Sequence, residues 1–522
     1  MLLALSVASL SAPSATAQTG AEKRPAAAKD QPGATDTVII SNMPKQKSRI
    51  RSLLSRMLGK PQGLASETGE SEVLSVPKSQ TTRLSKRLKQ LGVKVTKLRE
   101  DWNHILKRHK GPMTRSQQEM VDKMRAAPEA VSVGILKAPD APLSGYVLTG
   151  PDNKPEPLSW PPRDTSISTI VIPISETQNI TLQRLRVTTS PEGCTWAGVV
   201  QETGERALLM WWKDGRLTGL VGYMGRIYTV MNIGGDVHAM VETDPRKLPP
   251  DHAKVSSARA DKSRVGDTIG IGRPQSGERQ APLPAPPDVK PFPDAERLEL
   301  EAKKITIDLM MLYTKKAASR YIRDPADLIA LAVEQANETF RNSGLENIAL
   351  RLVHTQMIDY DETGGEHFEH LYRIVDGVGP FKDVRKLRDE KRADLVGMIM
   401  DDASGCGLST RVAAGSEEAY FVVHHSCAAI TITIAHEIGH ILGARHDRRI
   451  DPSNAPFSYG HGFVNGNKWR TMMSYQESCQ GCPRIPFWSN PRVKYNGEAT
   501  GTNAEDNARV ILEQAERVSN FR

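Results

Sequence analysis

The chain has 522 residues, and at roughly 150 residues per domain this length predicts about three domains. Hydrophobic residues make up 39% of it, and no run approaches the roughly 18–20 consecutive apolar residues of a membrane-spanning helix, which excludes an integral membrane protein. Five cysteines are too few for a disulfide-built scaffold, which leaves packed cores to hold the fold.

The net charge of +8 is concentrated in the amino-terminal part of the chain. Residues 44–125 hold 20 Lys and Arg against 7 Asp and Glu, whereas residues 305–522 hold 25 against 29. The C-terminal part therefore gives no electrostatic case for nucleic acid binding. Within the basic block, Thr82–Lys110 has leucines at near-helical spacing and predicts a helix. Its basic face is a candidate contact for an anionic polymer or membrane surface, although a solvated charged face is the simpler interpretation.

The amino terminus has the pattern of an export signal. Met1–Leu10 is apolar, and Ala15-Thr16-Ala17 is a small-x-small site that fits signal-peptidase cleavage. The usual positive charge at the start is missing, since no Lys or Arg precedes Lys23. We expect a signal peptide over residues 1–17 and a secreted or periplasmic protein. Residues 18–125 are expected to form a basic, partly disordered region that contains the helix named above.

Two changes of composition divide the following part of the chain. Residues 183–243 alternate apolar runs with turn signals, which predicts a β-meander, and we place a β-rich domain over residues 126–245. Residues 246–304 collect nine prolines among charged and small residues, which predicts an exposed linker.

After the linker, strand and helix signals alternate, which is typical of an α/β domain. Alternating or continuous apolar residues predict strands over Ile305–Tyr313, Ile348–Val353 and Ala393–Met400. Asp327–Asn342 carries apolar residues on one helical face and predicts a helix. The last predicted domain therefore covers residues 305–522.

Residues 434–447, which read IAHEIGHILGARHD, contain the candidate metal ligands and the candidate catalytic residue. Residues four apart on a helix share a face, so His436 and His440 can present two imidazole nitrogens to one metal ion. Glu437 lies beside that face, where its carboxylate can reach a water on the metal without being a ligand.

The rest of the segment supplies a turn and a third ligand. Gly443 fits the left-handed end of a helix, after which the chain turns back and His446 can bind the same ion. Three histidines leave the fourth position of a tetrahedral zinc to water, which is typical of a catalytic zinc site. A structural zinc site would explain neither the open position nor the adjacent Glu437.

The pattern HExxHxxGxxHD resembles the metzincin zinc endopeptidases, and the Asp after the third histidine is similar to their adamalysin or reprolysin branch. Residues 471–475, which read TMMSY, look like the methionine turn that metzincins place beneath the metal. By the family's Met-x-Tyr spacing, Met473 is implied to pack under the imidazoles. Tyr475 departs from the adamalysin pattern and is more similar to serralysins and astacins, in which that tyrosine binds zinc or hydrogen-bonds the tetrahedral intermediate.

The resemblance extends to bacterial secreted reprolysin-like and peptidyl-Asp-type metallopeptidases, and it covers about residues 305–522. It implies a twisted, mostly parallel sheet packed on helices, with the zinc helix as the floor of the cleft. It also implies a preproprotein, in which the β-rich segment resembles a propeptide.

The implied activity is zinc-dependent hydrolysis of peptide bonds in protein substrates. Zinc lowers the pKa of its bound water toward about 7 and polarises the scissile carbonyl, while Glu437 takes the water proton and returns it to the leaving amine. Two other functions stay open: a secreted zinc-containing binding or adhesion module that acts through the basic block, and a zinc hydrolase of a non-peptide acyl substrate. Binding that weakens steeply with rising ionic strength would identify the first, and substrate profiling would identify the second.

The five cysteines fit two disulfides and one remaining thiol. In an exported protein we expect Cys406 to pair with Cys427 and Cys479 with Cys482, although a lone C-x-x-C is also the pattern of a redox pair or of half a zinc ribbon. Cys194 then remains in the pro-region. Its thiolate is a candidate fourth zinc ligand that blocks a zymogen, and an ordinary buried thiol is the alternative.

Peptidyl-Asp specificity would require a cationic pocket. Arg411, Arg445 and Arg470 are candidates, and no spacing argument selects among them. The composition of residues 246–304 also makes that segment the expected place of activation cleavage.

Overall fold

The computed structural model describes residues 35–41, 63–65, 71–90, 94–97, 106–137, 147–149, 155–157, 169–190, 193–212, 215–251, 253, 287–320 and 325–522. The chain falls into two compact units, Met1–Leu98 and Arg99–Arg522. The expected signal peptide, residues 1–17, lies outside the described residues. Among the described helices, none combines the length and the apolar composition needed to span a bilayer.

The first unit contains a small antiparallel sheet and one helix. The strands follow the order β2-β3-β1-β4. The elements are β1 (Thr35–Ser41), β2 (Gly63–Ala65), β3 (Ser71–Pro77), α2 (Lys78–Gln90) and β4 (Lys94–Lys97).

The helix expected over Thr82–Lys110 is present only in its first part. In α2, Leu84 and Leu88 are buried, which confirms the amphipathic pattern there. The exposed basic residues are Arg83, Lys86, Arg87 and Lys89. The expectation is wrong for Lys94–Lys97, which form β4 and pair with β1. The β-branched residues of this segment favour a strand, and pairing with β1, which is distant in sequence, stabilises it.

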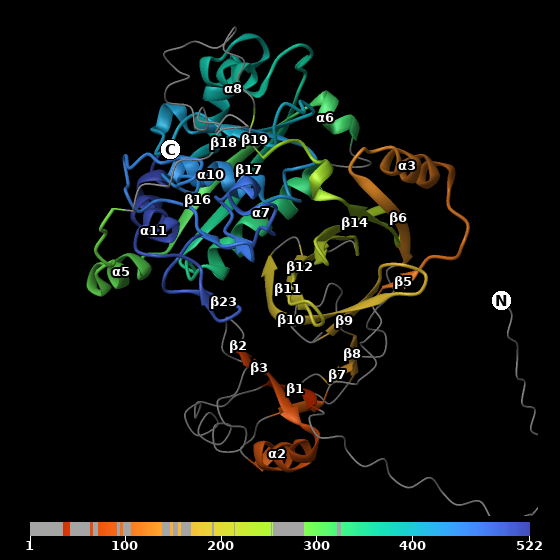
Figure 1. Cartoon of the computed structure of the whole chain (residues 1–522). Helices are drawn as coiled ribbons and strands as arrows, with labels where there is room; N and C mark the ends of the chain where they lie inside the picture. Colours follow the sequence, from red (N-terminus) through yellow and green to blue (C-terminus); the bar gives the residue numbers. More distant parts are fainter. Residues whose placement is uncertain are drawn as a thin grey trace, which may run out of the picture. The chain divides into compact units, whose positions relative to one another are not determined.

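The second unit begins with a nine-stranded antiparallel sheet in the order β5-β6-β15-β14-β13-β12-β11-β10-β9. Each strand from β9 to β15 pairs with the next one along the chain, which is the meander expected over residues 183–243. The sheet curls until its end strands β5 and β9 contact each other (Figure 1). The strands are β5 (Lys107–Arg108), β6 (Ala130–Lys137), β9 (Thr169–Pro173), β10 (Asn179–Ser190), β11 (Gly193–Val200), β12 (Arg206–Trp212), β13 (Leu217–Tyr223), β14 (Arg226–Gly234) and β15 (Val237–Thr243).

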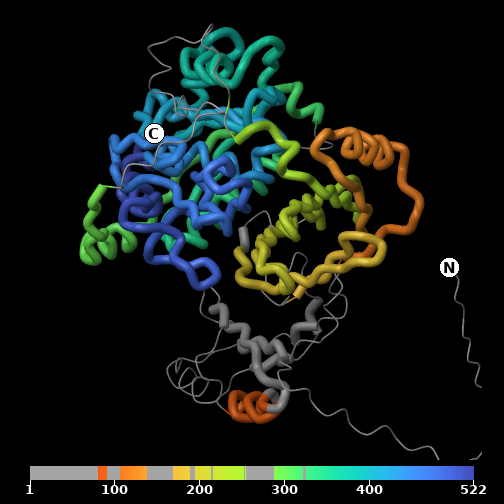
Figure 2. The backbone as a smooth tube through the Cα atoms, in the orientation of Figure 1, coloured from red at the N-terminus to blue at the C-terminus, as the bar shows by residue number. Residues whose placement is uncertain are grey.

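A segment from early in the chain completes this sheet. α3 (Arg115–Arg125) begins with a capping box at Thr114 and packs on β6 and β14. In Figure 2 this orange segment lies beside the yellow-green strands that come much later in the sequence. The structure also contains a short pair of strands, β7 (Val147–Thr149) and β8 (Pro155–Pro157), and the 3-10 turn η2 (Pro245–Lys247).

Successive residues of the curled sheet face two different cores. Trp196, Leu209 and Val230 are buried in a core of the sheet itself. Ala197 and Leu208 belong instead to the core of the C-terminal part, whose helix α7 (Pro325–Asn342) contacts the sheet. Ion pairs frame this apolar contact: Arg186 to Glu338 at 2.5 Å, and Arg216 to Asp327.

His238 is the buried histidine of this sheet, and its neighbours hold it neutral. Its Nε2 accepts hydrogen bonds from the backbone N of Leu217 at 3.0 Å and from the Asn232 amide at 3.2 Å, while its Nδ1 donates to the carbonyl of Asp236. Protonation at Nε2 would break both accepted bonds, and burial lowers the pKa of His238 to about 4.

We therefore predict that stability falls as the pH falls from about 6.5 toward 4, because the unfolded chain binds the extra proton over that range. At pH 4.5 the loss attributable to His238 is about 2–3 kcal/mol relative to pH 7. Chemical denaturation of the wild type and of His238→Gln at the two pH values measures it. The variant should lose less stability on acidification; an equal loss in both proteins would refute the assignment, and His354→Gln serves as a control.

The C-terminal part contains a five-stranded sheet in the order β17-β16-β18-β20-β19. Three of its pairings are parallel, and β19 joins β20 in antiparallel direction, so the sheet is mostly parallel as expected. The strands are β16 (Ile305–Thr314), β17 (Ile348–Ile358), β18 (Leu395–Met400), β19 (Gly407–Ser409) and β20 (Tyr420–His424). The three strands and the helix predicted from periodicity in this part are all present, with shifted ends.

Helices and short turns surround this sheet (Figure 1). The site helix α10 (Thr433–Leu442) packs against α7, β19, β20 and α11 (Asn507–Val518), which fixes it between the sheet and the last helix. The other elements are α6 (Lys315–Arg320), α8 (His367–Asp376), η3 (Gly379–Phe381), α9 (Val384–Lys391), η4 (Ser416–Glu418), β21 (Val464–Asn465), β22 (Trp469–Arg470), η5 (Gln476–Cys479), β23 (Lys494–Tyr495) and β24 (Glu498–Ala499).

Part of the expected linker, residues 246–304, is ordered against the C-terminal part. The segment was expected to be an exposed linker, but α5 (Asp294–Glu301) forms there, and Arg297 pairs with Asp294 and Glu301 across its turns. Phe292 just before it is buried beneath the guanidinium of Arg509, 4.7 Å from the ring centre.

Candidate metal centre

The site is built on α10, all of whose residues are buried. The helix ends at Gly443, which has a φ of 114°. A Cβ at this position would lie 2.7 Å from the ring of Phe457, so glycine is required both by the left-handed conformation and by the close approach. The chain turns back at this point and carries His446 toward the helix, as the sequence predicted.

The Nε2 atoms of His436, His440 and His446 converge on one point. Their mutual distances are 3.2 Å, 2.9 Å and 3.1 Å, and the three residues form the one fully buried cluster of potential metal ligands among the described residues. Zinc–nitrogen bonds of about 2.0–2.1 Å at tetrahedral angles place ligand nitrogens about 3.3–3.4 Å apart. The three imidazoles therefore fit a zinc ion with little adjustment.

Backbone carbonyls orient two of these rings. The Nδ1 of His436 lies 3.0 Å from the carbonyl oxygen of Met472, and the Nδ1 of His440 lies 2.8 Å from that of Ala444. An Nδ1–H that donates to a carbonyl leaves the Nε2 lone pair for a metal, which is the arrangement of ligating histidines. The methionine turn and the helix end thus set the ring orientations.

Met473 lies buried beneath the site helix. A Cβ added at Gly439, in the middle of α10, would lie 3.2 Å from its Sδ and 2.6 Å from the ring of Trp488. The helix approaches this layer closely because Gly439 has no side chain. The structure thus places Met473 against the middle of the site helix, with Met472 as a neighbouring core residue.

Asp447, directly after His446, connects the turn that carries this histidine to the methionine turn through hydrogen bonds. Its carboxylate accepts hydrogen bonds from the backbone N of Tyr475 at 3.0 Å and from the Ser478 hydroxyl at 2.7 Å. Burial raises the pKa of Asp447, and these hydrogen bonds oppose the rise. The residue therefore positions Tyr475.

Tyr475 is buried, and its hydroxyl contacts one histidine of the cluster. The Oη lies 3.1 Å from the Nε2 of His446, and the two rings are 4.5 Å apart between centroids. Burial raises the pKa of the hydroxyl well above its usual value. Tyr475 thus joins the histidine cluster through His446.

Glu437 is held by the edge strand of the sheet. Its Oε2 accepts a hydrogen bond from the Ser409 hydroxyl at 2.7 Å, and a Cβ at Gly407 would lie 2.5 Å from Oε1. Burial raises the pKa of Glu437 to about 8, while Ser409 and the charge of Arg484 act in the opposite direction. Sequence analysis missed Ser409, because a lone serine in a short strand carries no signal of its own.

A second group of potential ligands consists of Asp401, His424 and His425. His424 and His425 have no metal-ligand spacing in the sequence, and their surroundings agree with a structural role. Asp401 pairs with His425 at 3.0 Å and with Arg320 at 2.9 Å. Burial opposes its charge, but these partners hold the pKa of Asp401 well below its usual range. The carboxylate of Asp401 is therefore already engaged in ion pairs.

The cysteines divide between two disulfides and one thiol. Cys406 pairs with Cys427 and Cys479 with Cys482, the pairs expected from the sequence. Cys194 does not reach the histidines: it is buried in the core of the curled sheet, where burial raises the pKa of its thiol to about 12. The structure therefore contradicts the thiol switch, because a neutral thiol packed in that core is no zinc ligand, and it agrees with the ordinary buried thiol.

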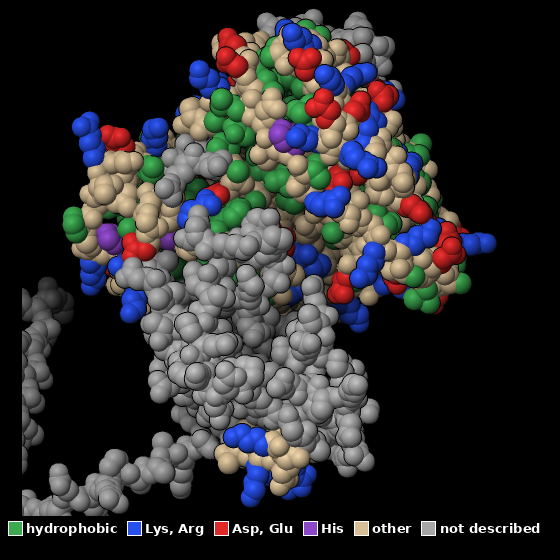
Figure 3. All heavy atoms as spheres, turned by 180° about the vertical axis from the view of Figure 1, so that it is seen from behind, with side chains coloured by type: hydrophobic (Ala, Val, Ile, Leu, Met, Phe, Trp, Pro, Cys, Tyr) green, Lys and Arg blue, Asp and Glu red, His purple; other side chains and the backbone are tan. Residues whose placement is uncertain are grey.

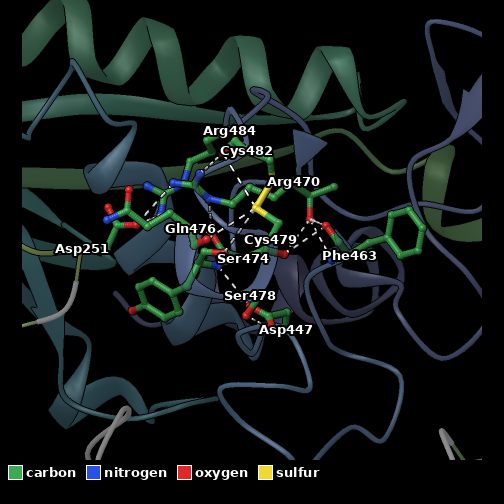
Figure 4. Close-up of a disulfide and its surroundings, with 12 residues drawn as sticks. Asp251, Asp447, Phe463, Arg470, Ser474, Gln476, Ser478, Cys479, Cys482 and Arg484 are labelled. Atoms are coloured by element: carbon green, nitrogen blue, oxygen red, sulfur yellow. Dashed lines mark hydrogen bonds and ion pairs between the residues drawn. A yellow bond between two sulfur atoms is a disulfide. The ribbon is translucent and has the colours of Figure 1, made fainter. Parts of the chain in front are cut away.

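The three arginines proposed for a cationic pocket have different surroundings. Arg411 pairs with Glu418 at 2.8 Å, and Arg445 pairs with Asp451 at 2.6 Å. Arg470 instead lies beside Arg484, and both contact the carboxylate of Asp251 (Figure 4). Sequence analysis missed Arg484 and Asp251, which approach each other only through the fold.

Comparison with known proteins identifies relatives of this arrangement. Residues 303–489, which contain the histidine cluster, match metallo-peptidase family M12. The chain is 30% identical over 308 residues to a peptidyl-Asp metalloendopeptidase of Xanthomonas campestris pv. campestris, covering 59% of this chain and 67% of the relative. It is also 30% identical over 313 residues to the protein of that name from Stenotrophomonas maltophilia, covering 59% and 68%.

Among solved structures, metalloproteinase-II from Bacteroides fragilis matches 66% of this chain and 90% of its own, with a TM-score of 0.33 and 14% identity. The sequence relatives share more than two thirds of their length with this chain, and the family match spans its three converging imidazoles. The chain therefore belongs to metallo-peptidase family M12 and is a zinc metalloendopeptidase related to the bacterial peptidyl-Asp enzymes.

Proposed function

We propose that the chain is an exported precursor of a protease that cuts proteins beside aspartate, with Glu437 as general base and general acid. The observation that carries the catalytic part is the convergence of three Nε2 atoms, 2.9–3.2 Å apart, next to the buried carboxylate of Glu437. Two imidazoles held by backbone carbonyls and a carboxylate held by Ser409 form a preorganised site.

The roles of the residues follow from their positions. His436, His440 and His446 would hold zinc, which when bound supplies a Lewis acid that polarises the scissile carbonyl and acidifies water. Glu437 accepts a proton from the attacking water and donates it to the departing amine, and Ser409 keeps the carboxylate oriented while this happens. The hydroxyl of Tyr475 donates a hydrogen bond to the oxygen that becomes negatively charged during attack.

We predict that Tyr475→Phe lowers kcat/KM about 10²–10³-fold, the usual effect of removing one such donor. The zinc content should stay at that of the wild type, because three imidazoles remain. Steady-state kinetics together with metal analysis measure both quantities. Unchanged kinetics would exclude the role, and Tyr459→Phe, which removes a hydroxyl that donates to Glu513 at 2.6 Å, is the matched control.

Export and precursor processing rest on separate observations. The apolar, small-residue amino terminus has the pattern of a signal peptide, and two disulfides fit an oxidising compartment. The antiparallel sheet before the metal-binding part resembles a propeptide in its position. Amino-terminal sequencing of secreted material tests this proposal: a start within residues 246–304 supports it, and a start upstream of residue 183 contradicts it.

Aspartate specificity is taken from the relatives, which are named peptidyl-Asp metalloendopeptidases. Digestion of casein by the zinc-loaded full chain, before and after limited trypsin treatment, followed by mass-spectrometric mapping of the cuts, tests both the activity and the specificity. We expect cuts beside aspartate that a zinc chelator abolishes. Chelator-sensitive cuts without any preference for aspartate would contradict the specificity alone, and no cuts at all would contradict the protease.

A further inference from the structure

The segment that follows the curled sheet enters the metal-binding part of the chain. The carbonyl of Pro250 accepts a hydrogen bond from the backbone N of Cys406 at 2.8 Å. Cys406 directly precedes β19, the edge strand whose residues contact Glu437. An extended peptide that bonds to a sheet edge is a common way to hold a substrate, and this segment lies where such a peptide would begin to pair.

Close packing fixes the same segment on the other side of Asp251. Ala253 is 4% exposed and belongs to the core that contains Met310, Val396 and Leu408. A Cβ at Gly405 would lie 2.3 Å from the Cα of Ala253, so this approach requires glycine at position 405. Ala253 therefore anchors the end of this segment in the core of the metal-binding part.

Asp251 places its carboxylate between two arginines, as Figure 4 shows. Its Oδ2 lies 2.8 Å from Nη2 of Arg484 and 3.4 Å from Nη2 of Arg470. The arginine side chains are only 9% and 10% exposed, and that of Asp251 is 16% exposed. Such a desolvated pair of cations requires an anion, because unpaired buried charge is strongly unfavourable.

Backbone carbonyls aim both guanidinium groups at the same point. Arg470 donates through Nε to the carbonyl of Ser474 at 3.0 Å and through Nη1 to that of Cys482, within the disulfide loop. Arg484 donates through Nη1 to the carbonyl of Thr431 at 3.1 Å. Each arginine thereby presents its Nη2 to the carboxylate of Asp251, which is the geometry of a prebuilt anion site.

This site adjoins the reaction centre. Both arginines bond the carbonyl of Ser474, the residue before Tyr475: the Nε of Arg470 lies 3.0 Å from this oxygen and the Nη2 of Arg484 lies 3.4 Å from it. Thr431, whose carbonyl Arg484 also bonds, lies two residues before the site helix α10 begins. On the surface visible in Figure 3, basic and acidic side chains of the described residues are interspersed.

We infer that Arg470 and Arg484 form the subsite that binds the acidic side chain of the substrate, and that Asp251 fills this subsite in the precursor. The inference rests on the proposed function and names the residues behind its aspartate specificity. The segment around Asp251 then acts as an internal substrate mimic, and its departure opens both the subsite and the sheet edge.

The test uses the zinc-loaded full chain and two internally quenched peptides that differ only in one Asp or Asn. Asp251→Asn should raise kcat/KM for the Asp peptide at least tenfold over the wild-type precursor. In that background, Arg484→Gln should reduce the ratio of Asp to Asn hydrolysis at least tenfold, and Arg484→Lys should retain part of it. Arg411→Gln, which breaks an arginine–glutamate pair elsewhere in the same domain, should leave the ratio unchanged.

A second readout does not depend on catalysis. Lys247 is exposed just before the segment, and Asp251→Asn should accelerate tryptic cleavage there at least tenfold in the Glu437→Gln background. An unchanged tryptic rate overturns Asp251 as the occupant, even if no peptide is hydrolysed. If the Arg484 variants hydrolyse the two peptides with the same Asp to Asn ratio as their Asp251→Asn background, the subsite is refuted but the protease activity is not. Absence of hydrolysis in every variant, with casein as substrate as well, refutes the proposed function instead.

Discussion

Replacement of Glu437 by Gln is expected to lower kcat/KM about 10²–10⁴-fold, because the amide cannot take a proton from water and return it to the amine. The substitution keeps the size of the side chain, and the amide can still meet the Ser409 hydroxyl, now 2.7 Å from Oε2. Zinc binding should be unchanged, since the three imidazoles do not depend on this carboxylate. Hydrolysis of casein and metal analysis on the same preparation measure both effects.

The matched control for this variant is Glu498→Gln. Glu498 is a partly exposed carboxylate that pairs with Lys468 at 2.6 Å on a distant hairpin, and its loss should leave the rate within about twofold. If Glu437→Gln retained full activity at full zinc content, the carboxylate would not be the proton carrier. Loss of zinc together with activity would show a structural effect and would also count against the assignment.

The second large effect is expected from His446→Ala, which removes the ligand that the turn after Gly443 delivers. Loss of residues that merely orient a ligand costs 10–100-fold in metal affinity, so loss of the ligand itself should cost more than about 100-fold. The variant should therefore purify without zinc and without activity. Equilibrium zinc titration and casein hydrolysis measure the two losses.

His424→Ala is the control for this prediction, because His424 belongs to the second group of histidines. This variant should retain wild-type zinc content, since Asp401 in that group is paired with cations. Retention of zinc by His446→Ala and its loss from His424→Ala would reverse the assignment of the metal site.

Features encoded within one short segment could be predicted from the sequence. His436, Glu437 and His440 owe their arrangement to one helix, and Gly443 and His446 to the turn that follows it, so spacing alone placed them. The strands and the helix after Ile305 also follow from local periodicity, because both faces of this sheet are covered and the apolar runs are long.

Features that depend on approach of distant segments could not be predicted. Ser409 reaches Glu437 across 28 positions, and Asp251 reaches Arg484 across 233 positions. Nothing local to either residue marks it. The same reason explains the strand at Lys94–Lys97, where pairing with β1 overrode a helical pattern, and the position of Cys194, whose burial depends on its neighbours in the sheet.

The central claim is that the three imidazoles hold a zinc ion beside Glu437, and anomalous diffraction at the zinc absorption edge tests it most directly. Crystals of the zinc-loaded full chain should show one dominant peak about 2.0–2.1 Å from the Nε2 atoms of His436, His440 and His446. A dominant peak at Asp401, His424 and His425, or no peak at the three converging imidazoles, would contradict the account.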